Sequence, residues 1–255
     1  MKSLVASCMG LAFALSAAAA RADAGDDLAN VCAASSSYDL TVAPNALVFE
    51  RGAPSPRRIE WRGGQLRVDG ARVPLDTEGA DRLGLFDREL RALLPRVKTV
   101  AMHGVDAVMA TLREQILALA PSPDARAQVE QRLGQTEATL RQRIARSTST
   151  RDWQAEALEA EAESALDDVA GVIAADTGRR SVQAALDGDV QGALALPAQA
   201  GDLAAQLRPR IERRLRELRP QVAALCPSIR RLAELQDGLR DGRGRPLDLV
   251  SIDAR

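Results

Sequence analysis

Apolar and polar residues alternate along the segment from Tyr38 to Leu75, which is the pattern of half-buried β-strands. Three turn pairs separate the apolar runs of this segment: Pro44-Asn45, Gly63-Gly64 and Asp69-Gly70. Asp-Gly and Gly-Gly between such runs are strong hairpin signals. The pattern predicts a small antiparallel meander of four or five short strands. Such a sheet needs another element across its apolar face.

From Asp76 almost to Leu239 the apolar positions recur every three or four residues, as in amphipathic helices. Pro95 is expected to end a first helix, and a second runs from about residue 96 to 120. Breaks at residues 121–124 and 147–150 delimit the next two helices, which are expected to form a helical hairpin. The weakly patterned stretch 178–201 predicts a short helix within a loop.

The last helical stretch must be started, kinked or segmented by its three prolines, Pro209, Pro220 and Pro227. The tail after Leu239 ends in an alternating run, LDLVSID, that predicts a final strand on the sheet. The predicted fold class is therefore α+β. A small N-terminal β-meander at 25–75 packs against a larger all-helical body with a helical hairpin at 76–239, and residues 240–255 form a C-terminal tail.

The first 24 residues have the pattern of a cleaved signal peptide. Lys2 precedes an uncharged run from Leu4 to Ala20, and Ala22-Asp23-Ala24 offers small residues where a signal peptidase cuts. Cleavage after Ala20 is the alternative. A lipoprotein box at Cys8 would leave a leader with almost no apolar stretch. The leader predicts export to the periplasm, and no later segment is apolar enough to span a membrane.

Composition narrows the possible partners. The chain has 255 residues, with 34 basic and 35 acidic side chains and a formal net charge of −1. This balance argues against a polycation that binds nucleic acid by bulk charge. Hydrophobic residues make up 46%, enough to bury a core, whereas aromatic residues make up only 2% and offer few platforms for stacking bases. Nucleic acid is therefore not an expected partner.

The cysteines predict one disulfide. Cys8 leaves with the leader, so Cys32 and Cys226 remain, and two thiols in an exported chain favour a bond between them. The bond would close a loop of 194 residues. The alternatives are two thiols that never meet, or a metal site. Two cysteines and one histidine are too few for a tetrahedral zinc site built from protein ligands without the help of a carboxylate, so no metal is expected.

Four stretches carry a resemblance to a known family: YDLTVAPNALVFE, GGQLRVDGARVPLD, RLGLFDRELRALLP and VAALCPSIRRLAELQ. In this order they resemble the YggN family of Gram-negative periplasmic proteins, a domain of unknown function. The resemblance extends from about Cys32 to about Leu239. It implies an exported α+β protein with a paired cysteine at each end. It provides no established catalytic or binding residues.

The sequence contains few residues in patterns that catalysis requires. His103 is the single histidine, so a serine or cysteine nucleophile would have no other histidine to act as its base. Nucleophile-elbow, zinc-protease, P-loop and dinucleotide motifs are absent from the sequence. The Asp187-Gly188-Asp189 run lacks the third acid and the glutamate of a calcium loop. The chain is therefore expected to be no enzyme and to need no cofactor.

The strongest local feature is a run of arginines opposed by only Glu212 and Glu217. Its members are Arg208, Arg210, Arg213, Arg214, Arg216 and Arg219. Such a face could bind phosphate, lipopolysaccharide or an acidic partner. Against this, the chain has only two lysines, so arginine is its default base. The acidic helix from Glu156 to Asp168 could also neutralise the arginines internally.

Two functions follow from these observations. The first is a non-enzymatic interaction or scaffold protein, whose amphipathic helices hold another periplasmic protein or a second copy of the chain. The alternative is a binding module for an anionic cell-envelope component, which uses the arginine-rich helix 208–219.

Overall fold

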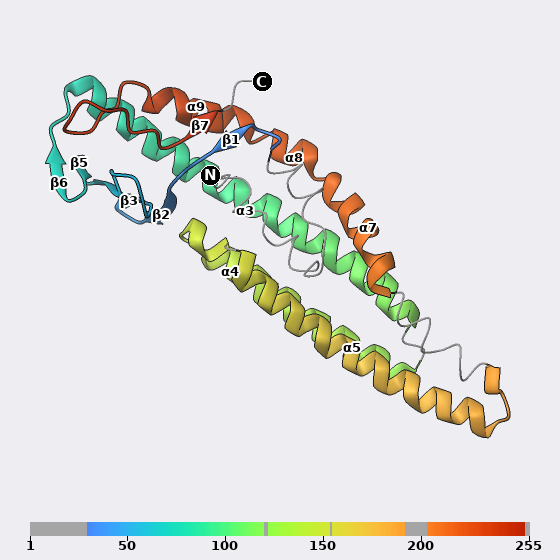
Figure 1. Cartoon of the computed structure of the whole chain (residues 1–255). Coiled ribbons are helices and arrows are strands. Elements are labelled where there is room, and N and C mark those ends of the chain that lie inside the picture. The colour runs from blue at the N-terminus through green and yellow to red at the C-terminus, as the bar shows by residue number, and fades with distance from the viewer. Residues whose placement is uncertain (1–29, 120–121, 154, 192–202, 253–255) are drawn as a thin grey trace.

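The computed structural model describes residues 30–119, 122–153, 155–191 and 203–252. The side chains of residues 117–119, 155–166, 203–206 and 208 are left out of the description. The predicted signal peptide lies outside these ranges. An antiparallel sheet comes first in the described chain and a long helical body follows, so the α+β prediction is confirmed (Figure 1).

The meander is a five-stranded antiparallel sheet in the order β2-β3-β4-β5-β6. Its strands are β2 (Asp39–Ala43), β3 (Ala46–Glu50), β4 (Arg58–Arg62), β5 (Gln65–Val68) and β6 (Ala71–Val73). Each predicted turn pair joins two neighbouring strands, with Val42 opposite Leu47 and Val68 opposite Ala71. One face of the sheet is buried, and Phe49 on that face meets Phe86 of the first helix edge to face. The helix supplies the cover that the sequence required.

Helix α3 (Thr77–Leu119) runs unbroken for 43 residues, which is about 65 Å. The expectation that Pro95 ends a helix is wrong. The proline removes one backbone donor, but Leu93 before it and Val100 after it are both buried in the same hydrophobic core. This continuous packing holds the helix together across the lost hydrogen bond. Helix α3 is thus the axis of the fold.

Helices α4 (Pro123–Arg146) and α5 (Ala155–Leu186) form the predicted helical hairpin along one side of α3 (Figure 1). Ser122 caps α4, because its Oγ accepts from the backbone N–H of Ala125. Helix α5 continues through Gly178, so the loop expected from that residue is wrong over its first part. One glycine costs a helix only about 1 kcal/mol, and the alanines around it favour helix.

Three helical segments follow along the other side of α3: α7 (Leu203–Arg216), α8 (Arg219–Ala223) and α9 (Cys226–Gln236). Pro220 and Pro227 lie in the first turns of α8 and α9, where a missing N–H costs nothing, and Pro209 lies within α7. Prolines therefore segment this stretch, as the sequence predicted.

The C-terminal tail does form a strand, β7 (Ser251–Ile252), but the prediction that it joins the meander is wrong. It pairs instead with β1 (Ala34–Ser35), which precedes the meander. Gln236 directs the tail, because its Oε1 accepts from the backbone N–H groups of Leu249 and Val250. These polar contacts hold the tail beside α9.

The predicted disulfide between Cys32 and Cys226 is confirmed, with the two Cα atoms 5.1 Å apart. Both sulfur atoms are buried beside Val222. The bond fixes the segment before β1 to the first turn of α9. The ends of the described chain therefore lie together (Figure 1).

Removal of the disulfide should destabilise the protein without unfolding it. We expect Cys32→Ser with Cys226→Ser to lower the free energy of unfolding by about 2–4 kcal/mol, because the unfolded chain loses a long cross-linked loop. Chemical denaturation measures this. A reductant should weaken only the wild-type protein, and an equal loss in the double variant would contradict the explanation.

Gly70 should be needed for its backbone conformation. Its φ is +84°, whereas helical Gly134 has an ordinary φ, and neither has a neighbour within contact distance of an added Cβ. We expect Gly70→Ala to cost about 1–2 kcal/mol and Gly134→Ala to gain about 0.5–1 kcal/mol. Thermal melting of both variants tests this, and shifts of the same sign would refute it.

Candidate functional site

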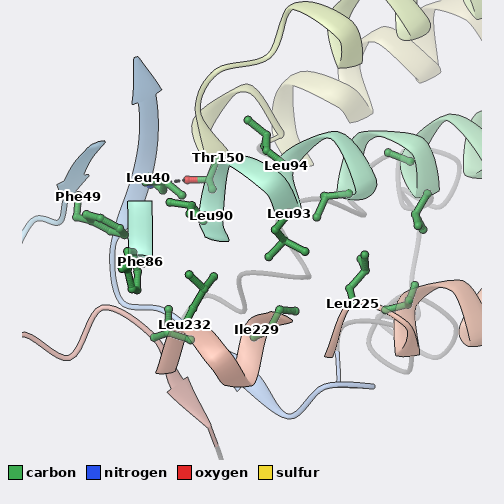
Figure 2. Close-up of a pocket in the computed structure, with 15 residues that line it drawn as sticks. Leu40, Phe49, Phe86, Leu90, Leu93, Leu94, Thr150, Leu225, Ile229 and Leu232 are labelled. Atoms are coloured by element: carbon green, nitrogen blue, oxygen red, sulfur yellow. Dashed lines mark hydrogen bonds between the residues drawn. The ribbon is translucent and has the colours of Figure 1, made fainter. Parts of the chain in front are cut away.

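An apolar cavity of about 100 Å³ lies between the meander, α3, the α8–α9 segment and the C-terminal tail (Figure 2). The residues that line it are Leu40, Phe49, Phe86, Leu90, Leu93, Leu94, Val97, Val100, Ala101, Thr150, Val222, Leu225, Ile229, Leu232 and Val250. All but Thr150 have purely apolar side chains. Elements that are far apart in the sequence therefore build one continuous apolar wall.

Helix α3 forms the longest wall of the cavity. Its contribution extends from Phe86 to Ala101, which is about 22 Å along the helix axis. Ile229 and Leu232 of α9 face this wall across the hollow, and Leu40 and Phe49 close the end nearest the sheet (Figure 2). The site is consequently elongated in the direction of α3.

The cavity offers water almost nothing to bind. The hydroxyl of Thr150 is its one side-chain polar group, and this oxygen already accepts from the backbone N–H of Leu40 at 2.9 Å. Cavities lined by aliphatic and aromatic side chains stay dry and take up small apolar molecules. The arrangement suits an apolar ligand and provides no group for acid–base or nucleophilic chemistry.

Leu94 and Val97 line the cavity and are partly exposed, so they mark a route to solvent. Lys98, one helical turn beyond Leu94, donates to the backbone oxygens of Ala145 and Ser147. Burial lowers the pKa of this lysine, and the charge of Asp152 partly opposes that shift. The ammonium holds the end of α4, and with it the loop that carries Thr150, beside the cavity.

The tail completes the enclosure. Val250 lines the cavity and is buried, and Leu247 and Leu249 just before it are buried too. Cys226 follows the lining residue Leu225 directly, so the disulfide borders the same wall. Sequence reasoning missed this site, because each lining residue is an ordinary core position in its own element and only the tertiary arrangement leaves a space between them.

The structure brings the predicted arginines together on the outer surface of α7 and α8. Leu207, Ile211 and Leu215 of α7 are buried against α3, and the arginines point away from that stripe. The exposed members are Arg210, Arg213, Arg214, Arg216 and Arg219, which we call the arginine face. The side chain of Arg208 lies outside the described residues.

The acidic helix packs elsewhere than on the arginine face. Helix α5 lies along α4, and Asp168 of α5 forms an ion pair with Arg132 of α4 at 3.2 Å. The side chains of residues 156–163 lie outside the description. Within the face, Arg214 forms an ion pair with Glu217 at 3.4 Å, and both side chains are more than half exposed. Exposed pairs of this kind stabilise little.

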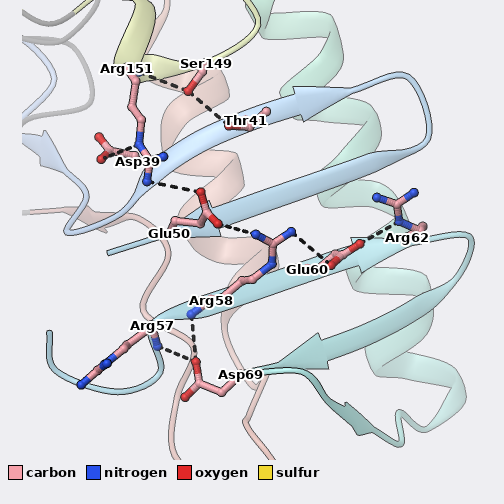
Figure 3. A network of polar contacts seen from close by, with 10 residues as sticks. All are labelled: Asp39, Thr41, Glu50, Arg57, Arg58, Glu60, Arg62, Asp69, Ser149 and Arg151. Atoms are coloured by element: carbon pink, nitrogen blue, oxygen red, sulfur yellow. Dashed lines mark hydrogen bonds and ion pairs between the residues drawn. The ribbon is translucent and has the colours of Figure 1, made fainter. Parts of the chain in front are cut away.

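Charges on the outer face of the sheet are arranged differently (Figure 3). Glu60 accepts from Arg58 and Arg62, and hydrogen bonding to Arg62 is the main reason that its pKa is lowered. Arg151, in the 3₁₀ turn η2 (Thr150–Trp153), pairs with both Asp39 and Glu50. These contacts attach the turn that carries Thr150 to the sheet, so the network has a structural role.

His103 is exposed, and its Nδ1 lies 2.6 Å from Oε1 of Gln221. In the described part of the chain, no group of three His, Cys, Asp or Glu side chains is placed to hold a metal ion. Among the same residues, no helix is both long and apolar enough to cross a membrane.

A family model described as "Protein of unknown function (DUF2884)" matches residues 32–248. Comparison with curated proteins and with solved structures returned no match. The matched range includes both cysteines, the meander and every element that contributes to the cavity except the last residues of the tail.

Filling the cavity should stabilise the protein. We expect Ala101→Leu to raise the free energy of unfolding by about 1 kcal/mol, because the added carbons enter empty space. Ala125 of α4 is fully buried and does not line this cavity, so Ala125→Leu should instead cost about 1–3 kcal/mol by overpacking. Denaturant unfolding compares the two variants, and a loss at Ala101 as large as that at Ala125 would contradict an accessible void.

Proposed function

The chain belongs to the DUF2884 family of proteins of unknown function, and we propose that it is an exported, non-enzymatic binding protein that holds an apolar chain in its cavity. The elongated apolar cavity carries this proposal. Its long wall favours an unbranched chain, such as the acyl chain of a lipid or fatty acid, over a compact ring.

The energetics of the cavity fit such a ligand. Each methylene group that leaves water contributes about 0.8 kcal/mol, and the one polar side chain of the wall, Thr150, already accepts a hydrogen bond from the backbone of Leu40. Affinity would therefore come from chain length, with selectivity set by the width of the channel between α3 and α9.

Export to the periplasm is part of the proposal. It is supported by the leader-like residues 1–24 and by the disulfide, because such bonds persist in oxidising compartments. The absence of catalysis is supported by the chemistry of the cavity wall, which presents no base, nucleophile or charged side chain to a ligand.

Under this proposal, the interaction partner expected from the sequence is a small apolar ligand and not another protein. The apolar faces of α3, α4 and α9 are buried within the fold, which reduces what they can offer to another protein. Among described residues, the exposed large hydrophobic side chains of α5 are Val182 and Leu186, near its end. We therefore place the ligand inside the molecule.

A second candidate function is binding of an anionic cell-envelope component by the arginine face. The observation that favours it is the exposure of five arginines on α7 and α8, beside only Glu212 and Glu217. This candidate does not compete with the first, because the arginines lie outside the cavity.

A series of saturated fatty acids tests the leading proposal. We expect affinity to rise about fourfold per added methylene until the cavity is full, as about 0.8 kcal/mol per group implies. Displacement of a fluorescent fatty acid measures this. Ala101→Leu should reduce the affinity and shorten the longest chain accepted, whereas binding that ignores both chain length and this substitution would refute the proposal.

A further inference from the structure

The arginine face is left unused by the cavity, and its surroundings indicate what it contacts. We infer that this face docks the protein on a lipid bilayer that carries anionic headgroups. The inference rests on the proposed function in one respect, because the bilayer would be the store of acyl chains for the cavity. Charge, exposure and position support the docking surface itself.

The packing of α7 fixes the direction of the arginines. Leu207, Ile211 and Leu215 are buried, and α7 lies along α3 over its length. Just beyond α7, the side chain of Leu218 packs against Gly104 of α3. Its Cδ1 lies 3.7 Å from the position that a Cβ atom at residue 104 would occupy. Rotation of α7 would expose this apolar stripe to water. The arginines are therefore directed outward from α7.

Arginines that lie between elements of this protein have acidic partners. Arg113 of α3 contacts Glu130 and Glu137 of α4, and Arg141 of α4 contacts Asp106 of α3. The arginine face differs, because in the described part of the chain Arg210, Arg213 and Arg216 form no ion pair. A default preference for arginine over lysine explains its frequency in the chain but not this local surplus of positive charge.

The chemistry of the face favours a bilayer over other anionic partners. Helix α7 has no aromatic residue, and its described leucine and isoleucine side chains are buried. A protein partner would therefore find no aromatic or aliphatic anchor, and nucleic-acid bases would find no stacking surface. Charge spread along one exposed helix matches a surface of many headgroups, where each basic residue contributes independently.

The position of the face connects it with the cavity. Helix α7 leads through Leu218 into α8, and Val222 of α8 and Leu225 both line the cavity. A bilayer bound at the arginine face would thus lie next to the wall formed by α8. This proximity is what a protein needs if it exchanges acyl chains with a membrane.

Vesicle co-sedimentation of the mature chain tests the inference. We expect binding to vesicles of phosphatidylcholine mixed with phosphatidylglycerol, little binding to phosphatidylcholine alone, and steep weakening as salt is raised. The triple variant Arg213→Gln, Arg214→Gln, Arg216→Gln should bind the anionic vesicles about 100-fold more weakly, since each arginine near such a surface contributes about fivefold.

A matched control removes the same charge elsewhere. Arg57, Arg67 and Arg72 are exposed on or beside the sheet, and their change to Gln should leave vesicle binding nearly unaltered. Equal losses in the two triple variants would overturn the inference, because net charge alone would then explain binding. Melting curves confirm that each variant is folded, and if the α7 variant does not fold, the lipid and salt dependence of the wild-type protein decides.

Two further arms identify the anion and separate the two proposals. Soluble glycerol phosphate should displace the protein from vesicles only weakly, and equally tight binding of glycerol phosphate or of duplex DNA would overturn docking on a bilayer. Ala101→Leu should retain vesicle binding while it loses fatty-acid affinity. Fatty-acid binding without vesicle binding would refute the docking surface alone, and the reverse result would refute the cavity as the ligand site.

Discussion

Burial of the apolar residues of α3 is the constraint on which the rest of this fold depends. A helix of 43 residues with leucine and valine on more than one side is not stable alone in water, and each neighbour covers part of it. The hairpin of α4 and α5 lies along one side, the α7–α9 segment lies along another, and the meander covers the beginning of the helix. The cavity is the place where these covers meet without filling the space. The shape of the cavity therefore depends on how several interfaces pack together.

Local signals in the sequence predicted the parts of the fold that depend on local physics. The turn at Asp69-Gly70 requires a left-handed conformation that glycine adopts easily, so these two residues were enough to predict the hairpin. Pro220 and Pro227 began helices for an equally local reason. The prediction at Pro95 was wrong because whether a proline ends a helix depends on how the helical turns on either side of it pack. The position of β7 was wrong because the side chain of Gln236, far from the meander in sequence, fixes the course of the tail.

The same distinction separates the two candidate sites. Six arginines in twelve residues were evident from the sequence, and the five whose side chains are described lie opposite the buried apolar stripe, as the helical period indicates. Whether acidic partners neutralise them depends on which helices become neighbours, and α5 packs on α4 instead of α7. The cavity gave no signal at all, because its lining residues have the composition of an ordinary core. A void is determined by small mismatches in side-chain volume across interfaces, which no periodic pattern encodes.

The bond between Cys32 and Cys226 has a mechanical consequence. If the described chain were pulled from its two ends, tension would pass through the covalent sulfur bridge and bypass the chain between Cys32 and Cys226, which are 194 positions apart. The meander, α3 and the helical hairpin would carry no load. Only α9 and the tail, with the two-residue ladder of β1 and β7, would be drawn out. The cross-link thus divides the protein into a body that bears no tension and a short segment, from α9 to β7, that extends. This segment includes Val250, so extension would open the cavity wall at that residue.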